Sequence, residues 1–260
     1  MIGDGSISSA LDNTGVIALV TGGGSGIGRA TAILLAARGA TVIVADLSAP
    51  AARETVELIV ACGGSGVACE VDVSDSASVD ALFAEVATRF DRLDIAVNSA
   101  GISGRTQGFT NQGESEFDAI IGVNLKGVWL CMQREITMFG MQGGGAIVNV
   151  ASALGLVGAE TKPAYSATKH AVIGLTRSAA IEHSRHGIRV NAVCPGVIRT
   201  PLMDKAGLSA DFAASLVKLH PIGRLGTAEE VAEAICWLSS PAASFVTGAA
   251  LAVDGGWTAA

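Results

Sequence analysis

Two residues in the second half of the chain have the types and spacing of a proton-transfer pair. Tyr165 is the only tyrosine in the sequence, and Lys169 follows it four residues later. On a helix, residues at this spacing lie on one face. A free phenol has a pKa of about 10, and a nearby ammonium group favours the phenolate. The pair therefore predicts proton transfer to or from an alcohol oxygen near neutral pH.

Two polar residues elsewhere in the chain are predicted to complete this site. Ser152 follows an apolar strand predicted at 146–150, and parallel α/β sheets bind ligands at the carboxyl ends of their strands. Its hydroxyl is expected to hydrogen-bond the same substrate oxygen. Asn124 lies where a long helical stretch at 114–141 is expected to break, and we expect it to anchor a water that links Lys169 to solvent. Singly, each of these residues is equally typical of an ordinary loop, cap or helix surface.

A glycine-rich segment near the N-terminus predicts a phosphate-binding turn. A strand predicted at 16–20 runs into the segment 21–28, with the sequence TGGGSGIG, and a helical stretch follows. The backbone N–H groups of such a turn face a phosphate at the helix N-terminus. The segment lacks the Gly-Lys-Ser/Thr ending of a P-loop, and Arg29 occupies the last glycine position of G-x-G-x-x-G. The pattern that remains is T-G-x-x-x-G-x-G, with Gly22, Gly26 and Gly28.

An acid at the end of the second predicted strand indicates which dinucleotide the turn binds. Asp46 follows the strand at 41–45 and lies 18 residues after Gly28. A carboxylate in this place accepts hydrogen bonds from the adenosine ribose hydroxyls, and it repels a 2′-phosphate. No Lys or Arg follows Asp46 directly, although Arg29 is a possible phosphate partner. We therefore expect NAD, with NADP as the weaker alternative.

The fold must bring together the ends of the strands that carry the glycine turn, Asp46 and Ser152. Apolar, β-branched runs alternate with amphipathic stretches along the whole chain, which is typical of a parallel sheet covered by helices on both faces. No linker or composition shift divides the sequence. We expect one α/β domain over 1–260, doubly wound, with a mostly seven-stranded parallel sheet. The strands are predicted at 16–20, 41–45, 67–71, 93–97, 146–150, 188–194 and 249–253.

Composition and charge exclude several other classes of protein. Half of the 260 residues are hydrophobic, which excludes a disordered chain. The net charge of −7 and the lack of a basic cluster argue against a nucleic-acid partner. No apolar run reaches the roughly 18 residues of a membrane span, and residues 1–10 do not resemble a signal peptide. Five cysteines without a C-x-x-C pair predict reduced thiols and a cytoplasmic protein. No metal site is expected, since His183-x-x-His186 has no further ligands and suits a helix end.

Taken together, these motifs resemble those of the short-chain dehydrogenase/reductase family, in its compact NAD(P)-dependent branch. The resemblance runs from about residue 14 to residue 258. It implies a Rossmann fold, a Ser-Tyr-Lys site supported by an Asn, hydride transfer between the cofactor and an alcohol or ketone, and a homotetramer. Asn98-Ser99 departs from the commoner Asn-Asn of the family. Besides the glycine turn, the matching motifs are Asp72-Val73, Asn98-Ser99-Ala100-Gly101, Asn124, Ser152, Tyr165-x-x-x-Lys169 and Pro195-Gly196.

The resemblance also implies a set of cofactor-binding residues. Asp72 and Val73 would contact the adenine, Lys169 the nicotinamide ribose, and Ile198 with Thr200 the nicotinamide carboxamide or phosphate. Asn98, Ala100 and Gly101 would lie along the adenosine. The complete predicted set is Gly22, Ser25, Gly26, Ile27, Gly28, Asp46, Asp72, Val73, Asn98, Ala100, Gly101, Tyr165, Lys169, Pro195, Gly196, Ile198 and Thr200.

Two segments that follow strand ends are expected to border the substrate. They are 101–113 and 199–226, and the second resembles the mobile lid of the family. Their apolar residues favour an apolar or cyclic secondary alcohol or ketone. Residues 1–13 are predicted to be either a flexible tail or a subunit contact.

Other functions are compatible with these motifs. A 3-oxoacyl-thioester reductase and a glucose-type sugar dehydrogenase share the same motifs. A dehydratase or epimerase would need extra substrate segments, for which this chain has little length. A non-catalytic regulator that senses NAD would not need both Tyr165 and Lys169. Their joint presence favours an NAD-dependent oxidoreductase.

Overall fold

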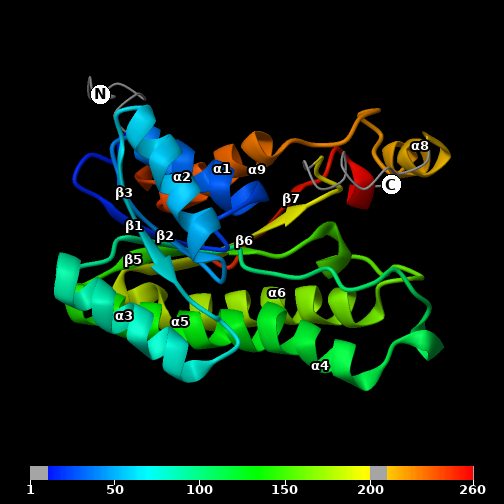
Figure 1. Cartoon of the computed structure of the whole chain (residues 1–260), viewed down its shortest axis with the longest axis horizontal. Helices are drawn as coiled ribbons and strands as arrows, with labels where there is room; N and C mark the ends of the chain where they lie inside the picture. The colour runs from blue at the N-terminus through cyan, green and yellow to red at the C-terminus, as the bar shows by residue number, and fades with distance from the viewer. Residues whose placement is uncertain (1–10, 200–209, 260) are drawn as a thin grey trace.

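Seven strands form one sheet in the order β3-β2-β1-β4-β5-β6-β7. Every neighbouring pair is parallel, so the predicted doubly wound, seven-stranded sheet is confirmed. Figure 1 shows this sheet between two layers of helices. The strands are β1 (Ile17–Thr21), β2 (Thr41–Asp46), β3 (Ser65–Glu70), β4 (Ile95–Asn98), β5 (Gly145–Val150), β6 (Ile188–Pro195) and β7 (Ala250–Val253).

The coordinates are a computed structural model, and they describe residues 11–199 and 210–259. Most of the predicted tail therefore lies outside the described residues. So does the segment 200–209 of the predicted lid, including Thr200. The described part of that lid contains a helix, α8 (Ala210–Lys218).

The helices divide between the two faces of the sheet. On one face lie α1 (Gly26–Ala37), α2 (Ala49–Ala61) and α9 (Ala228–Ser239), and on the other lie α3 (Ser76–Phe90), α5 (Val128–Gln142) and α6 (Pro163–His183), as Figure 1 shows. Alternate residues of β1 explain the two layers. Leu19 is buried against α3, α5 and α6, whereas Ala18 and Val20 are buried against α1, α2 and α9. Both faces are apolar because both are covered.

Local sequence signals account for several helix ends. The Asp75 carboxylate caps α3 by accepting hydrogen bonds from the backbone N–H groups of Ala77 and Ser78. Thr227 and Glu230 form a capping box at the start of α9. Both arrangements satisfy N–H groups that have no partner within their own helix.

The predicted break near Asn124 is a change of helix type rather than an interruption. The helix α4 (Glu114–Ile121) continues through a π-helical segment, Gly122–Gly127, into α5. A π-helical turn is wider than an α-helical turn and is often found at functional sites. Asn124 lies in this segment and is buried.

The strand order places the site. The chain moves outward in one direction from β1 through β2 to β3, and in the other from β4 to β7, so β1 and β4 lie side by side where the order reverses. In open α/β sheets, a crevice forms at this point above the carboxyl ends of the strands. The glycine segment, Asp46 and Ser152 all follow strand ends at this edge.

Two further observations bear on the sequence predictions. All five cysteines are free thiols, and four of them are buried. In the part of the chain that the structure describes, no helix is long and apolar enough to cross a membrane.

Candidate active site

The turn between β1 and α1 owes its shape to two glycines. Gly22 has a φ of +65°, and a Cβ on it would lie 2.7 Å from the backbone N of Ala100. A Cβ on Gly28 would lie 2.2 Å from the carbonyl oxygen of Gly22. The turn therefore packs directly against the start of α1 and the end of β4. A side chain at either position would fill the space or separate the backbones.

Asp46 is tied to the same turn. Its carboxylate accepts hydrogen bonds from the backbone N–H groups of Gly24 (2.9 Å) and Ser48 (2.9 Å). Arg29 is engaged elsewhere, because its guanidinium donates to the Gly24 carbonyl (2.5 Å) and pairs with Glu54 (2.8 Å). Asp46 therefore lies at the glycine turn. Arg29, the nearby cation on α1, is held by its ion pair with Glu54 on α2.

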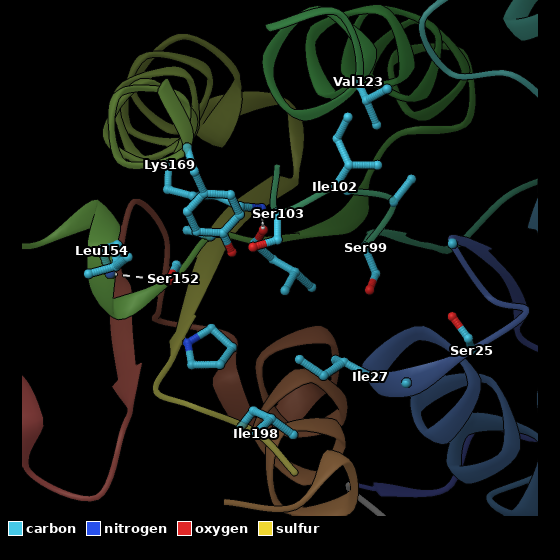
Figure 2. Close-up of a pocket in the computed structure, with 18 of the residues that line it drawn as sticks. Ser25, Ile27, Ser99, Ile102, Ser103, Val123, Ser152, Leu154, Lys169 and Ile198 are labelled. Atoms are coloured by element: carbon cyan, nitrogen blue, oxygen red, sulfur yellow. Dashed lines mark hydrogen bonds between the residues drawn. The ribbon is translucent and has the colours of Figure 1, made fainter. Parts of the chain in front are cut away.

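A cavity of about 660 Å³ joins the glycine turn to the predicted catalytic residues. In Figure 2, Ser25 and Ile27 lie on one side of it, and Lys169 and Ser152 lie on the other. Fifteen of the predicted residues line this cavity. They are Gly22, Ser25, Gly26, Ile27, Asp46, Asp72, Val73, Ala100, Gly101, Ser152, Tyr165, Lys169, Pro195, Gly196 and Ile198.

Of the predicted residues that the structure describes, three do not line the cavity. Gly28 packs beneath the turn, as described above, and Asn124 and Asn98 are both buried. The amide of Asn98 donates hydrogen bonds to Glu135 (3.1 Å) and Asn149 (3.0 Å), so it faces the interior between β4, β5 and α5. Asn98 thus supports the strand end from below, and it is the following residues, Ala100 and Gly101, that reach the cavity.

The side chain of Asn124 holds the loop that follows β4. Its amide donates to the carbonyl of Ile102 (2.8 Å) and accepts from the backbone N–H of the same residue (2.8 Å). Each polar atom of this side chain therefore makes a hydrogen bond to Ile102, which lines the cavity. The predicted role of Asn124 as an anchor for a water stays a prediction.

Tyr165 and Ser152 face each other across the end of β5. Burial raises the pKa of the Tyr165 phenol, and a hydrogen bond with Ser152 lowers it. The Ser152 hydroxyl also accepts a hydrogen bond from the backbone N–H of Leu154 (3.1 Å). Ser152 is thus held at the start of the short helical turn Ala153–Gly155, directly after β5.

Lys169 lies beneath Tyr165 on α6 and is 5% exposed. Its ammonium donates to the carbonyl oxygen of Val150 at 2.7 Å. Burial lowers the pKa of Lys169 to about 8, with the nearby Cys194 acting in the opposite direction. A buried amine with so low a pKa, in a cavity beside a phenol, is typical of a functional site.

Other residues that line the cavity have weaker signals in the sequence. Ile102 and Ser103 follow a strand end, so their place was foreseeable from the predicted loop 101–113. Lys162 and Trp257 had no pattern that pointed to them. The lining residues outside the predicted set are Leu47, Val71, Ser99, Ile102, Ser103, Val123, Val150, Ala151, Leu154, Lys162, Val197 and Trp257.

The residues present fit a nicotinamide dinucleotide. The glycine turn leaves space that a Cβ would fill, Asp46 supplies a carboxylate near it, and the Ser-Tyr-Lys group lies at the far side of one cavity. Among residues 11–199 and 210–259, no group of three or more His, Cys, Asp or Glu side chains could hold a metal ion. The architecture is that of the dinucleotide-binding α/β oxidoreductases.

Comparison with known proteins places the chain within this class. The family model described as enoyl-(acyl carrier protein) reductase matches residues 22–258. The chain belongs to the short-chain dehydrogenase/reductase family. Membership confirms the predicted hydride-transfer oxidoreductase acting on alcohol and ketone groups, and enzymes of this family use nicotinamide cofactors.

Three similar proteins cover almost the whole chain. Cyclohexanol dehydrogenase of Acinetobacter sp. (strain SE19) is 44% identical over 93% of this chain and 94% of its own length. Cis-4-hydroxycyclohexanecarboxylate dehydrogenase of Sinomonas cyclohexanicum is 46% identical over 94% of this chain and 96% of its own. The crystal structure of levodione reductase is 36% identical, with a TM-score of 0.92 over 95% of this chain and 99% of that one.

Proposed function

We propose that this chain catalyses the NAD-dependent oxidation of a cyclic secondary alcohol and the reverse reduction of the ketone. One observation carries the proposal. Ser152, Tyr165 and Lys169, which come from two separate elements, line the same cavity as the glycine turn and Asp46. A dinucleotide that spans this cavity brings its reactive end to the tyrosine.

In this proposal, Tyr165 is the general base for alcohol oxidation and the general acid for ketone reduction. Ser152 holds the substrate oxygen. Its Oγ accepts a hydrogen bond from Leu154, so its single proton, which Tyr165 receives in this structure, is the donor that the substrate oxygen would take over. Lys169 keeps a positive charge near the phenol and favours the phenolate. When bound, the nicotinamide accepts the hydride from the alcohol or supplies it to the ketone.

Asp46 supports NAD as the preferred cofactor. Its carboxylate lies at the end of β2, where the adenosine ribose binds in folds of this type. A 2′-phosphate would be repelled by this charge. Among the described residues, the cations that line the cavity are Lys162, at the N-cap of α6, and Lys169, on α6 itself, and both are near Tyr165 in the chain. Arg29 is held by Glu54.

The walls near Tyr165 support a cyclic, largely apolar substrate. Ile102, Leu154, Val197 and Trp257 line the same cavity as Tyr165. Two of the similar proteins carry names of dehydrogenases for six-membered ring alcohols. A cyclohexanol-type alcohol therefore fits better than a sugar.

A thioester substrate is the second candidate, because the matching family model is described as a reductase of acyl-carrier-protein substrates. Acyl carrier proteins are acidic, so their docking favours a basic surface. The net charge of −7 on this chain disfavours it.

The test is NADH formation at 340 nm with a panel of alcohols, each with NAD and with NADP. The panel contains cyclohexanol, 4-hydroxycyclohexanecarboxylate, a 3-hydroxyacyl thioester and glucose. We expect the ring alcohols with NAD to give the largest kcat/KM, and Tyr165→Phe to lower kcat by about 10²–10⁴-fold. A Tyr165→Phe enzyme with wild-type turnover would refute the proposed role. If the enzyme turns over only the thioester, the proposed ring-alcohol substrate is wrong.

We also propose a homotetramer. Several large apolar side chains are exposed on the described surface, among them Phe117 on α4, Trp129 on α5, Ile181 on α6 and Phe245 before β7. Subunit contacts would remove them from water. Light scattering after size-exclusion chromatography distinguishes four copies from one.

A further inference from the structure

Lys162 is a cation at an unusual place. It is the N-cap residue of α6, three residues before Tyr165, and it lines the same cavity as Tyr165 and Ser152. Short polar or acidic side chains are favoured at an N-cap, and positive charge is disfavoured at a helix N-terminus. Local helix stability therefore does not explain this lysine.

The charge of Lys162 is not neutralised by a neighbouring acid. Within the described part of the chain, no carboxylate lies within ion-pair distance of its ammonium. Glu116 is the acid that acts on it electrostatically. The Glu116 carboxylate is itself occupied, because it accepts hydrogen bonds from the Arg105 N–H and the Gln107 side chain and pairs with the Arg105 guanidinium. Burial lowers the pKa of Lys162, and the charge of Glu116 acts in the opposite direction without forming an ion pair.

Neutral oxygens hold the ammonium in a defined place. It donates to the Ser103 carbonyl (3.2 Å), the Ser103 hydroxyl (3.1 Å) and the Gly104 carbonyl (2.7 Å). The Ser103 hydroxyl acts as an acceptor here, so its own proton is left to donate to another group. Ser103 also lines the cavity and is drawn on its wall in Figure 2. A hydroxyl polarised by an ammonium is a strong donor to an anion.

We propose that Lys162 and Ser103 form a recognition site for an acidic group on the substrate. This inference rests on the proposed function and narrows it: the preferred substrate is a cyclic secondary alcohol or ketone that carries a carboxylate. The ring lies against Ile102 and Leu154, and its hydroxyl meets Ser152 and Tyr165. Its carboxylate accepts a hydrogen bond from the Ser103 hydroxyl and is attracted by the positive charge of Lys162, whose three N–H donors stay on Ser103 and Gly104.

Lys162 and Tyr165 lie three residues apart in sequence and line one cavity. One substrate that fills this part of the cavity can therefore present a hydroxyl to Tyr165 and an acidic group to the Ser103–Lys162 pair.

The experiment compares an acid with a neutral alcohol of similar shape. The pair is 4-hydroxycyclohexanecarboxylate and 4-methylcyclohexanol, assayed with wild type, Lys162→Met and Lys162→Arg. We expect wild type to favour the acid by at least tenfold in kcat/KM. Lys162→Met should lower kcat/KM for the acid at least 20-fold more than for the neutral alcohol, mainly through KM. Lys162→Arg should restore most of the preference.

A matched control removes a positive charge outside the cavity. Lys126 is exposed and donates to the Ser74 carbonyl, so Lys126→Met changes net charge as Lys162→Met does. We expect it to leave the acid-to-neutral ratio unchanged. If Lys162→Met lowers kcat/KM equally for both alcohols, Lys162 only tethers the loop at 103–104, and the inference is overturned.

A binding measurement separates this inference from the proposed function. Cyclohexanecarboxylate has no hydroxyl and cannot react, so calorimetric titration of the cofactor-loaded protein reports recognition alone. Tighter binding than cyclohexanecarboxamide, lost in Lys162→Met, supports the acid site even if no alcohol is turned over. Equal binding of the two compounds contradicts it, whatever the activity.

Discussion

The ammonium of Lys169 lies 5.5 Å from the centre of the Tyr165 ring and donates its short hydrogen bond to the Val150 carbonyl, not to the phenol. In this arrangement Lys169 faces the ring of Tyr165 without a hydrogen bond to the phenol oxygen. Burial disfavours the charged form of both groups, since it lowers the pKa of Lys169 and raises that of Tyr165. Ser152 acts against this effect at Tyr165, because its hydrogen bond lowers the phenol pKa.

This relationship predicts a pH dependence of opposite sign in the two directions. Alcohol oxidation needs the phenolate, so its kcat/KM should rise with pH until Tyr165 is deprotonated. Ketone reduction needs the protonated phenol, so its kcat/KM should fall over the same range. Ser152→Ala removes the hydroxyl that lowers the Tyr165 pKa. It should therefore shift the kcat/KM–pH profiles of both directions to higher pH, and it should also lower the rate. Steady-state profiles in both directions measure this, and a shift to lower pH would contradict it.

The charge of Asp46 predicts the response of cofactor choice to one substitution. Asp46→Asn keeps the shape of the side chain and an oxygen for the Gly24 N–H, but it removes the repulsion of a 2′-phosphate. The ratio of kcat/KM for NAD to that for NADP should fall by about 10-fold or more, which corresponds to about 1.4 kcal/mol. Asp72→Asn, at another acid that lines the cavity, is the matched control. An equal change in both variants would show that Asp46 does not select the cofactor.

Two glycine-to-alanine substitutions should have opposite effects. In Gly28→Ala the new Cβ lies 2.2 Å from the Gly22 carbonyl oxygen, so the turn must move. We expect a loss of about 1–3 kcal/mol in the free energy of unfolding and weaker NADH binding. Gly140→Ala on α5 meets nothing within 4 Å and should stabilise the protein by up to about 1 kcal/mol. Urea unfolding and NADH fluorescence measure both, and equal behaviour of the two variants would contradict the packing role of Gly28.

A buried acid predicts how stability depends on pH. Glu135 is fully buried on α5, and burial raises its pKa to about 8, although the hydrogen bond from Asn98 lowers it. The unfolded chain ionises this group near pH 4.5. Between these values the folded protein binds the extra proton, so its stability falls as pH rises from about 4.5 to about 8.

Glu135→Gln should abolish this part of the pH dependence. Glutamine keeps an oxygen for the Asn98 amide and places its NH₂ at the carboxylate oxygen that has no partner. We expect a melting temperature above that of wild type at pH 8–9, with the difference vanishing near pH 4.5. The exposed Glu57→Gln on α2 is the control. If the melting temperatures of Glu135→Gln and wild type change with pH in the same way, Glu135 does not cause the pH dependence of stability.

Much of the fold was predictable because its signals are local. The predicted bounds of each strand lie within about two residues of the observed bounds. Buried parallel strands are continuous apolar runs between amphipathic helices, so they are visible in the sequence. The irregularity near Asn124 was also predictable, although it is a π-helical segment and not the predicted break. The same holds for Tyr165 and Lys169, whose spacing of four is a property of one helix.

The amino-acid order alone determined the alternation of strands and helices, the glycine turn with Asp46, and the Ser152, Tyr165 and Lys169 group. It did not determine which polar side chains turn inward. Only the tertiary structure shows that Asn98 faces Glu135 beneath the sheet, that Arg29 is held by Glu54, and that Lys162 and Trp257 line the cavity. These contacts join residues distant in the chain, and their direction depends on how the packed elements orient each side chain, which no local spacing encodes.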